Sequence, residues 1–204
     1  MNEREAEDVV RHFLEGHNLR CVVPSKPERR SGQTPDFRGY HGEDLCFFAE
    51  VKSLRGDDPV DLALSGIDPV ETAVIFRNDP TFNRITTAIH KAVQQFDRLN
   101  ADREHPNVLA LVNYEQICGL HDLRGVLTGQ FYADDGTRDR IYSKYSDGRM
   151  AKDALKVDLY LWMDPNDPDG ATFVYTSPSS HRLRLCHCSD TIRPPFKPFE
   201  RDAP

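Results

Sequence analysis

The sequence has no long apolar run and no secretory signal. None of its 204 residues belongs to a stretch that approaches the roughly 20 consecutive apolar residues needed to span a bilayer. The N-terminal segment MNEREAEDVV is charged from its third residue, whereas a signal peptide requires an apolar segment there. We therefore expect a cytoplasmic protein, with a length suited to one domain.

Glycine motifs and a cysteine framework are also missing. The twelve glycines form neither G-x-x-x-x-G-K-[ST] nor G-x-G-x-x-G, so no loop that cradles nucleotide phosphates is predicted. No G-x-S-x-G segment marks a serine nucleophile. The five cysteines are odd in number and widely spread, which is not the pattern of a disulfide scaffold, and we expect mostly reduced thiols.

Positive charge is scarce as well. Lys and Arg total 26 against 33 Asp and Glu, which gives a formal net charge of −7. This balance argues against a protein that coats nucleic acid by bulk charge, because such binding depends on neutralising phosphates. A local basic patch remains compatible with it.

Hydrophobic spacing predicts alternating helices and strands. The first half is expected to contain a helix over 2–17, strands over 19–23, 36–40 and 45–53, a helix over 81–101 and a strand over 108–112. The polar stretches 24–35 and 54–80 are predicted as loops. Beyond residue 119 the signal weakens, and two more strands are expected over 157–163 and 172–175.

Three charged residues lie where this pattern predicts a buried sheet. Side chains alternate along a strand, so Glu50 and Lys52 share a face, about 6.6 Å apart. A hairpin turn at residues 39–42 would bring Asp36, at the start of the neighbouring strand, near Glu50 or Lys52. Glu7 flanks the apolar stripe of the first helix, about 20° from Leu14 at ~100° per residue.

Such a cluster has a natural chemical use. Carboxylates that converge in a partly buried cleft repel each other, and a hard divalent cation such as Mg²⁺, or Mn²⁺ in its place, relieves that repulsion. The Lys52 ammonium beside it can orient or help deprotonate a water and can neutralise charge that develops on a phosphate. Together these groups are the parts required for phosphodiester hydrolysis.

The same residues carry a resemblance to a known superfamily. Pro35-Asp36, followed after thirteen intervening residues by Glu50-Val51-Lys52, resembles the signature of the PD-(D/E)XK nucleases. The segment around Glu7 is similar to the leading helix of the Holliday-junction-resolvase-like members, and Lys91-Ala92-x-x-Gln95 is similar to their later helical motif. The resemblance covers roughly residues 3–113.

The resemblance implies a fold and a set of roles. The expected fold is α/β, with a restriction-endonuclease-like αβββαβ core, a mixed central sheet flanked by helices, and a C-terminal extension. Asp36, Glu50 and the Val51 carbonyl would be metal ligands, with Lys52 as the catalytic lysine. Glu7 would be a second-metal or water-mediated ligand, and Gln95 an auxiliary group.

Each of these residues also has a purely structural alternative. Glu50 and Lys52 could form a surface ion pair at a strand end, which stabilises little. Asp36 could be a turn residue after proline, and Glu7 an acid favoured by a helix N-terminus. Gln95 could be a solvated residue on the helix flank.

Cationic residues in three places are candidates for nucleic-acid contact. The segment 138–156 has six bases and three acids, a local balance of +3, with Tyr142 and Tyr145 among them. Bases meet phosphates and rings stack on unpaired nucleotides, although a solvated polar insertion has a similar composition. The candidate nucleic-acid-binding residues are Lys26, Arg29, Arg30, Arg84, Lys91, Arg138, Arg140 and Lys144.

These observations predict a Mg²⁺-dependent DNA endonuclease acting in restriction, phage defence, recombination or repair. We expect a nuclease core over 1–118, an insertion and added strands over 119–188 that complete the same domain and contribute to substrate recognition, and an extended Pro-rich tail over 189–204. DNA is the expected partner, and a homodimer and a protein partner stay open. The alternatives are a catalytically inactive protein-binding module, as an immunity or regulatory subunit would be, and an RNA-directed nuclease.

Overall fold

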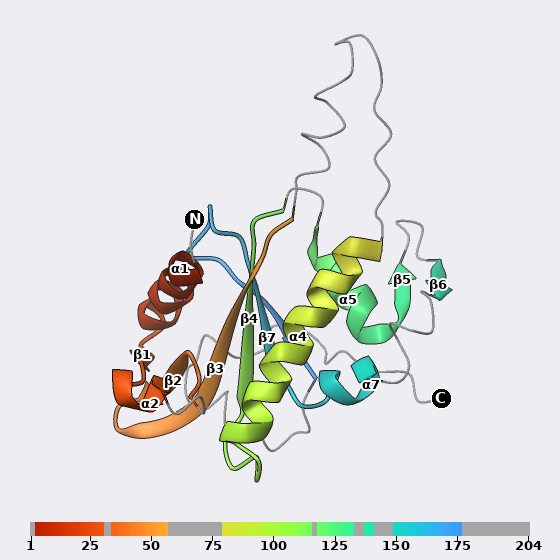
Figure 1. The fold of residues 1–204 in the computed structure, drawn as a ribbon. Helices are drawn as coiled ribbons and strands as arrows, with labels where there is room; N and C mark the ends of the chain where they lie inside the picture. The colour runs from red at the N-terminus through yellow and green to blue at the C-terminus, as the bar shows by residue number, and fades with distance from the viewer. Residues whose placement is uncertain are drawn as a thin grey trace.

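A mixed six-stranded sheet forms the centre of the protein. The computed structural model describes residues 3–30, 34–56, 79–115, 118–132, 137–140 and 149–176. The strand order is β1-β2-β3-β4-β7-β8 (Figure 1). The strands are β1 (Arg20–Val22), β2 (Phe37–His41), β3 (Asp44–Leu54), β4 (Asn107–Asn113), β7 (Leu159–Met163) and β8 (Thr172–Tyr175).

The middle of the sheet is parallel and its edges are antiparallel. β3, β4 and β7 run in the same direction, whereas β1–β2, β2–β3 and β7–β8 are antiparallel pairs. The residues of β4 are buried from Asn107 to Val112, as expected for a parallel strand covered on both faces. β2 and β3 form a hairpin whose turn uses Gly42 at φ 60°, a conformation that glycine adopts without strain.

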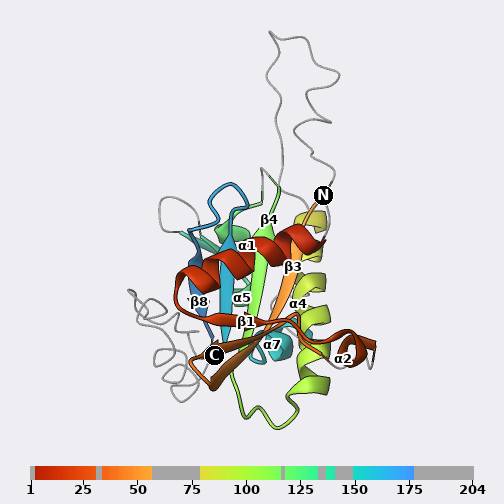
Figure 2. The same cartoon turned by 90° about the vertical axis from the view of Figure 1, so that its left-hand side faces the viewer.

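Helices cover both faces of this sheet. α1 (Glu3–Gly16) lies on one face, and α4 (Asp79–Leu99) lies on the other, together with α5 (Leu120–Thr128) and α7 (Arg149–Ala154) (Figures 1 and 2). Each helix packs an apolar stripe against the sheet, which places one hydrophobic core on each side. The chain is therefore an α/β protein with a three-layer arrangement.

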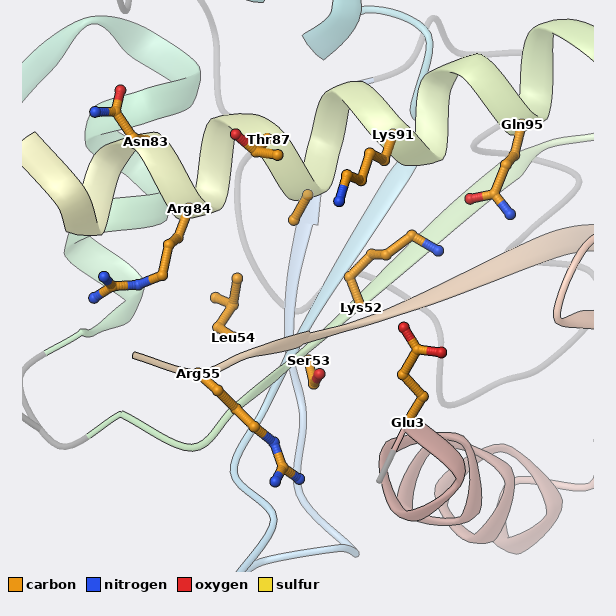
Figure 3. Close-up of a pocket in the computed structure, with 11 residues that line it drawn as sticks. Glu3, Lys52, Ser53, Leu54, Arg55, Asn83, Arg84, Thr87, Lys91 and Gln95 are labelled. Carbon is orange, nitrogen blue, oxygen red and sulfur yellow. The ribbon is translucent and has the colours of Figure 1, made fainter. Parts of the chain in front are cut away.

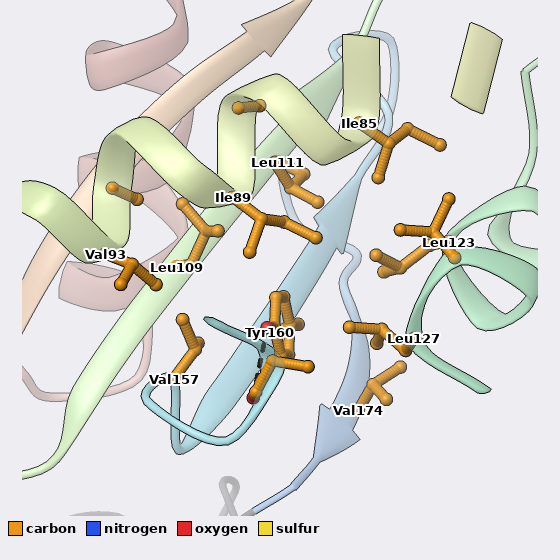
Figure 4. Packing of buried hydrophobic residues seen from close by; sticks show 14 of the residues in the cluster. Ile85, Ile89, Val93, Leu109, Leu111, Leu123, Leu127, Val157, Tyr160 and Val174 are labelled. Carbon is orange, nitrogen blue, oxygen red and sulfur yellow. Dashed lines mark hydrogen bonds between the residues drawn. The ribbon is translucent and has the colours of Figure 1, made fainter. Parts of the chain in front are cut away.

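Alternation along β3 divides its residues between the two cores. Phe47, Ala49 and Val51 belong to the core beneath α1, while Leu54 belongs to the core beneath α4. Figure 4 shows the second core, where α4 residues such as Ile89 meet Leu111 and Tyr160 of the sheet. Because Glu50 and Lys52 alternate with the residues of the first core, they lie on the α4 side.

Most of the predicted elements are confirmed. The helix expected over 2–17 is α1, and the one expected over 81–101 is α4, displaced toward the N-terminus by two residues. The strands of the first half lie within a residue or two of their predicted bounds. The two strands predicted near the end are β7 and β8, which join the same sheet as β1 to β4.

Two polar stretches contain more structure than the sequence analysis predicted. The stretch 24–35, expected to be a loop, includes the short helix α2 (Lys26–Arg30), whose start is capped by hydrogen bonds from the Ser25 amide and hydroxyl to Glu28. The stretch after residue 119 includes α5, α7 and a separate two-stranded sheet of β5 (Gln130–Tyr132) and β6 (Arg138–Arg140). Most of the loop predicted over 54–80, and the tail over 189–204, lie outside the described residues.

Two further observations concern the length of the helices and the state of the cysteines. Within the described ranges, the search for a helix of sufficient length and apolar character to traverse a bilayer returned none. Cys21 and Cys118 are free thiols, as predicted. Cys46 is disulfide-bonded and departs from the expectation of reduced thiols.

Candidate active site

The β2–β3 register brings Asp36 to the middle of β3. Phe37 is paired with Ala49, so Asp36, one residue earlier, lies beside the next residues of β3. The Val51 backbone N–H donates a hydrogen bond to Asp36 Oδ2 at 2.8 Å. This bond fixes the carboxylate against the strand that carries Glu50 and Lys52.

Glu50 and Lys52 extend this contact into a cluster of three charged groups. The Glu50 side chain is fully buried, and Lys52 Nζ donates a hydrogen bond to its Oε2 at 2.8 Å. The same Nζ lies 3.8 Å from Asp36 Oδ2. We call Asp36, Glu50 and Lys52 the acid–lysine cluster. Glu50 and Lys52 lie within β3, which continues to Leu54, and Asp36 directly precedes β2.

Burial governs the electrostatics of this cluster. It raises the pKa of Glu50 to about 8, with the Asp36 carboxyl adding to the shift and Lys52 opposing it. Burial acts against the charge of Lys52, but attraction by Glu50 and Asp36 outweighs it, so the pKa of Lys52 lies above its ordinary value. Lys52 is therefore an ammonium at neutral pH, and burial favours the protonated form of Glu50.

Glu7 approaches the cluster from α1. Burial raises the pKa of Glu7, and the charge of Asp36 raises it further. Arg29 from α2 and Arg11 from α1 act in the opposite direction. The structure thus brings Glu7 to the neighbourhood of Asp36, as the sequence analysis expected.

A groove with a volume of about 620 Å³ opens beside Lys52 (Figure 3). Lys52 of β3 and Lys91 of α4 point into it from opposite sides, and Gln95 lies one helical turn beyond Lys91. The residues that line it are Glu3, Lys52, Ser53, Leu54, Arg55, Asn83, Arg84, Thr87, Ala88, Lys91 and Gln95. Arg84, Lys91 and Gln95 therefore share one groove with Lys52.

Several groove residues were missed by the sequence analysis. Glu3 lies one helical turn before Glu7, and that four-residue spacing could have identified it. Arg55 follows the strand pattern beyond Lys52, but its partners come from other elements: the Tyr114 ring, 3.8 Å from its Cζ, and Glu5 Oε2, 3.6 Å from its Nη2. No local pattern predicts those contacts.

The other candidate cationic residues are distributed over two elements. Lys26, Arg29 and Arg30 lie exposed on α2, where Arg29 is close enough to lower the pKa of Glu7. Arg138 and Arg140 belong to strand β6 of the two-stranded sheet, outside the six-stranded sheet, and the structure describes only their backbone. Lys144 lies outside the described residues.

The cluster fits a divalent cation in part. Across the described ranges, no three or more His, Cys, Asp and Glu side chains gather closely enough to hold a metal ion by themselves. Asp36 and Glu50 supply two carboxylates, however, and Glu50 Oε1 is buried with no hydrogen-bond partner among the described residues. An acceptor oxygen of this kind is suited to a hard cation whose remaining ligands are a backbone carbonyl and water.

Comparison with family models, curated proteins and solved structures finds no match to this chain.

Proposed function

We propose that this protein is a metal-dependent nuclease that hydrolyses DNA phosphodiester bonds at the acid–lysine cluster. The observation that carries the proposal is the juxtaposition of two carboxylates and a lysine, all within hydrogen-bonding or ion-pair reach, beside a groove lined by further cations. Phosphodiester hydrolysis requires carboxylates that hold a cation, an ammonium group near the phosphate, and a groove that admits the nucleic acid.

The proposal includes a restriction-endonuclease-like core. In its support, α1 precedes three consecutive strands that pair antiparallel, and α4 then connects β3 to the parallel strand β4. Asp36 opens the second of these strands and Glu50 and Lys52 lie on the third, which is the placement that the resemblance implies. α2 is an addition between the first two strands.

The residues that would hold Mg²⁺ are Asp36, Glu50 and the Val51 carbonyl, with Glu7 as a second-metal or water-mediated ligand. When bound, this ion, or Mn²⁺ in its place, polarises a phosphate oxygen and makes a coordinated water easier to deprotonate. A cation beside Glu50 would also favour the ionised form of that buried carboxyl group, whose pKa burial raises.

Lys52 contributes charge and hydrogen bonds. Because the pKa of Lys52 lies above its ordinary value, it acts as an ammonium that orients a water or a phosphate oxygen, not as a general base. Positive charge beside the phosphate stabilises the transition state as negative charge develops. Gln95, which lines the same groove, can donate a hydrogen bond to the substrate.

One observation favours a second candidate, a catalytically inactive protein-binding module. Lys52 Nζ already lies within 4 Å of both carboxylates, so the cluster balances much of its own charge without a metal. This candidate predicts no cleavage and no stabilisation by Mg²⁺, whereas a cation that binds only the folded protein must raise its melting temperature.

A cleavage assay distinguishes these candidates. Single-stranded, duplex and branched DNA, and RNA of matched sequence, are incubated with the protein in Mg²⁺, Mn²⁺ or EDTA. We expect cleavage of DNA in either cation and none in EDTA. Cleavage confined to RNA would support the RNA-directed alternative, and the preferred DNA form would indicate whether restriction, phage defence, recombination or repair is the better context.

Asp36→Asn tests the role of the cluster in the same assay. Asparagine retains an acceptor for the Val51 N–H but lacks the charge, so we expect cleavage to fall by at least about 100-fold. Asp44→Asn makes the same change at an exposed position at the start of β3 and is expected to cut like the wild type. No cleavage by any variant, with no rise in melting temperature in Mg²⁺, would favour the binding module.

A further inference from the structure

Arg84 is held by a nearly buried carboxylate at the wall of the groove. Its Nη2 donates a hydrogen bond to Glu115 Oε2 at 2.6 Å. The Glu115 side chain is only 5% exposed, while 29% of the Arg84 side chain remains accessible. A guanidinium has five N–H donors, so one contact with Glu115 fixes the direction of the group without using up its capacity to bind an anion.

The segment that carries Glu115 is itself tethered to the sheet. The Asn113 side chain at the end of β4 accepts a hydrogen bond from the Glu115 N–H at 3.2 Å and donates one to the Glu115 carbonyl at 3.0 Å. The Tyr114 N–H donates a hydrogen bond to the Leu54 carbonyl of β3 at 3.0 Å. Glu115 is therefore a fixed feature of the β3–β4 edge.

The backbone at Gly56 also packs against the Arg84 guanidinium. A Cβ atom built at Gly56 would lie 2.6 Å from Arg84 Cζ, so any other residue there would displace the Arg84 side chain. Arg84 thus touches three segments of the chain: its own helix α4, the end of β3 beyond Leu54, and the segment after β4. Such preorganisation reduces the side-chain entropy lost when an arginine binds a ligand.

Arg84 and Lys52 line the same groove but different parts of it. Along α4, Arg84 lies seven residues, about 10 Å, before Lys91, the residue that faces Lys52. A strand of nucleic acid that places one phosphate at Lys52 would present another phosphate farther along the groove. Among the described residues that line the groove there is no Phe, Tyr, Trp or His, so contacts with these residues favour the phosphodiester backbone over stacked bases.

We infer that Arg84, positioned by Glu115, binds a substrate phosphate adjacent to the one that reacts at the acid–lysine cluster. This inference rests on the proposed nuclease function and assigns Glu115 as a positioning residue. The inference predicts the direction in which DNA binding changes when Glu115 loses its charge. Removing a negative charge near a polyanion site should tighten binding if charge alone matters, whereas loss of the carboxylate that orients Arg84 should weaken it.

Binding of a labelled 20-nucleotide DNA, single-stranded and duplex, is measured by fluorescence anisotropy. EDTA is present so that no divalent cation supports cleavage during the measurement. We expect Arg84→Gln to raise Kd about tenfold and to reduce the salt dependence by about one phosphate contact. Arg84→Lys, which keeps the charge but not the forked geometry, should raise Kd about threefold. Glu115→Gln should raise Kd about threefold, and it should add nothing to Arg84→Gln in the double variant.

Glu43→Gln is the matched control, since Glu43 is an exposed acid in the turn between β2 and β3 and loses the same charge. Its Kd should equal that of the wild type or fall slightly. Tighter or unchanged binding by Glu115→Gln overturns the inference. If Glu115→Gln fails to fold, an unchanged Kd for Arg84→Lys overturns it instead.

Failure of the inference and failure of the proposed function give different results. If the wild type cleaves DNA but Arg84→Lys and Glu115→Gln bind DNA with the wild-type Kd, the inference is rejected and the proposed function stands. The expected Kd pattern without any metal-dependent cleavage rejects hydrolysis but retains the phosphate site. A wild-type protein that binds no DNA rejects both.

Discussion

At the scale of single residues, the unusual feature is a carboxylic acid and an ammonium with almost no access to water. Glu50 is fully buried and Lys52 is 20% exposed, and each is hydrogen-bonded to the other. Burying charged groups opposes folding unless partners compensate, and here the compensation is incomplete because Asp36 adds a second negative charge. In the absence of a cation, the cluster therefore opposes folding.

The pKa of Glu50 makes the stability of the metal-free protein depend on pH. Because this pKa is raised from 4.5 to about 8 on folding, the folded state binds more protons than the unfolded state between these values. Glu50 therefore contributes a loss of stability as pH rises through this window, of up to about 1.4 kcal/mol per pH unit. Glu50→Gln should remove that contribution.

Urea unfolding in EDTA at pH 5, 6.5 and 8 measures this difference. The free energy of unfolding of the wild type should fall relative to that of Glu50→Gln as pH rises. Parallel pH profiles for the two proteins would mean that Glu50 ionises normally in the folded state.

The sequence was sufficient to find the cluster but not the support of Arg84. Asp36, Glu50 and Lys52 follow from strand alternation and one hairpin, both of which are local patterns. Glu115 contacts Arg84, which lies 31 positions earlier in the sequence, and its backbone is held by the Asn113 side chain. Such contacts depend on tertiary structure, and no spacing in the sequence predicts them.

At the scale of elements, β2 positions Asp36 by packing closely on β3. Gly39 of β2 is paired with Phe47, and a Cβ atom at Gly39 would overlap the Phe47 ring. Phe47 is fully buried in the core beneath α1 and has little freedom to move. The absence of a side chain at position 39 therefore allows the close approach of the two strands.

Gly39→Ala should destabilise the protein by about 1–3 kcal/mol through overpacking. Gly16→Ala is the matched control, because nothing lies within 4 Å of a Cβ atom at the end of α1. That variant should be neutral or stabilising by up to about 1 kcal/mol, as alanine is the better helix former. Thermal unfolding of both variants measures the contrast, and equal effects would contradict the packing argument.

A buried polar network joins the starts of β4 and β7. Asp158, fully buried, accepts hydrogen bonds from Arg103 Nη2 and from the Asn107 N–H, each at 2.7 Å. The Asn107 side chain is in turn bonded to Asn100 and to the Lys156 carbonyl. These bonds hold the connection after α4 against the sheet and so help to fix the helix that bears the groove residues.

Asp158→Ala should therefore cost about 3–5 kcal/mol, since it leaves a guanidinium and a backbone N–H without their acceptor. Asp97→Ala removes a carboxylate that is 51% exposed and pairs with Lys156 at the surface, so it should cost about 0–1 kcal/mol. Chemical denaturation gives both values. Similar losses in the two variants would show that the network does not carry the stability assigned to it.

Elements with strong periodicity were predictable, and short or weakly apolar ones were not. α1 and α4 have long apolar stripes, and the strands have apolar runs or alternation. α2 is a single turn, although the Ser25–Glu28 capping pair was a usable signal. α5 is only nine residues long and lies in a stretch whose overall polarity conceals Leu123, Val126 and Leu127 on its buried side.

At the scale of the whole molecule, the acidic net charge and the proposed substrate are compatible because charge is unevenly distributed. The chain carries −7 overall, yet Lys52, Arg55, Arg84 and Lys91 line the groove against one carboxylate, Glu3. Carboxylates just outside the lining offset part of this charge, since Glu50 pairs with Lys52, Glu5 with Arg55 and Glu115 with Arg84. The proposal therefore relies on the local placement of cationic groups along the groove and not on a large net positive charge. These residues come from β3, from the position directly after it and from α4, which packs on the face of the sheet to which Lys52 points.

The most direct test of the central claim is the single-turnover rate of DNA cleavage in saturating Mg²⁺ by the wild type, Lys52→Ala and Arg124→Ala. Arg124 is an exposed base on α5 outside the groove, so its variant makes the same charge change elsewhere. The account predicts metal-dependent cleavage that Lys52→Ala lowers by at least about 100-fold and Arg124→Ala leaves unchanged. Cleavage by Lys52→Ala at the wild-type rate, or none by the wild type, would contradict it.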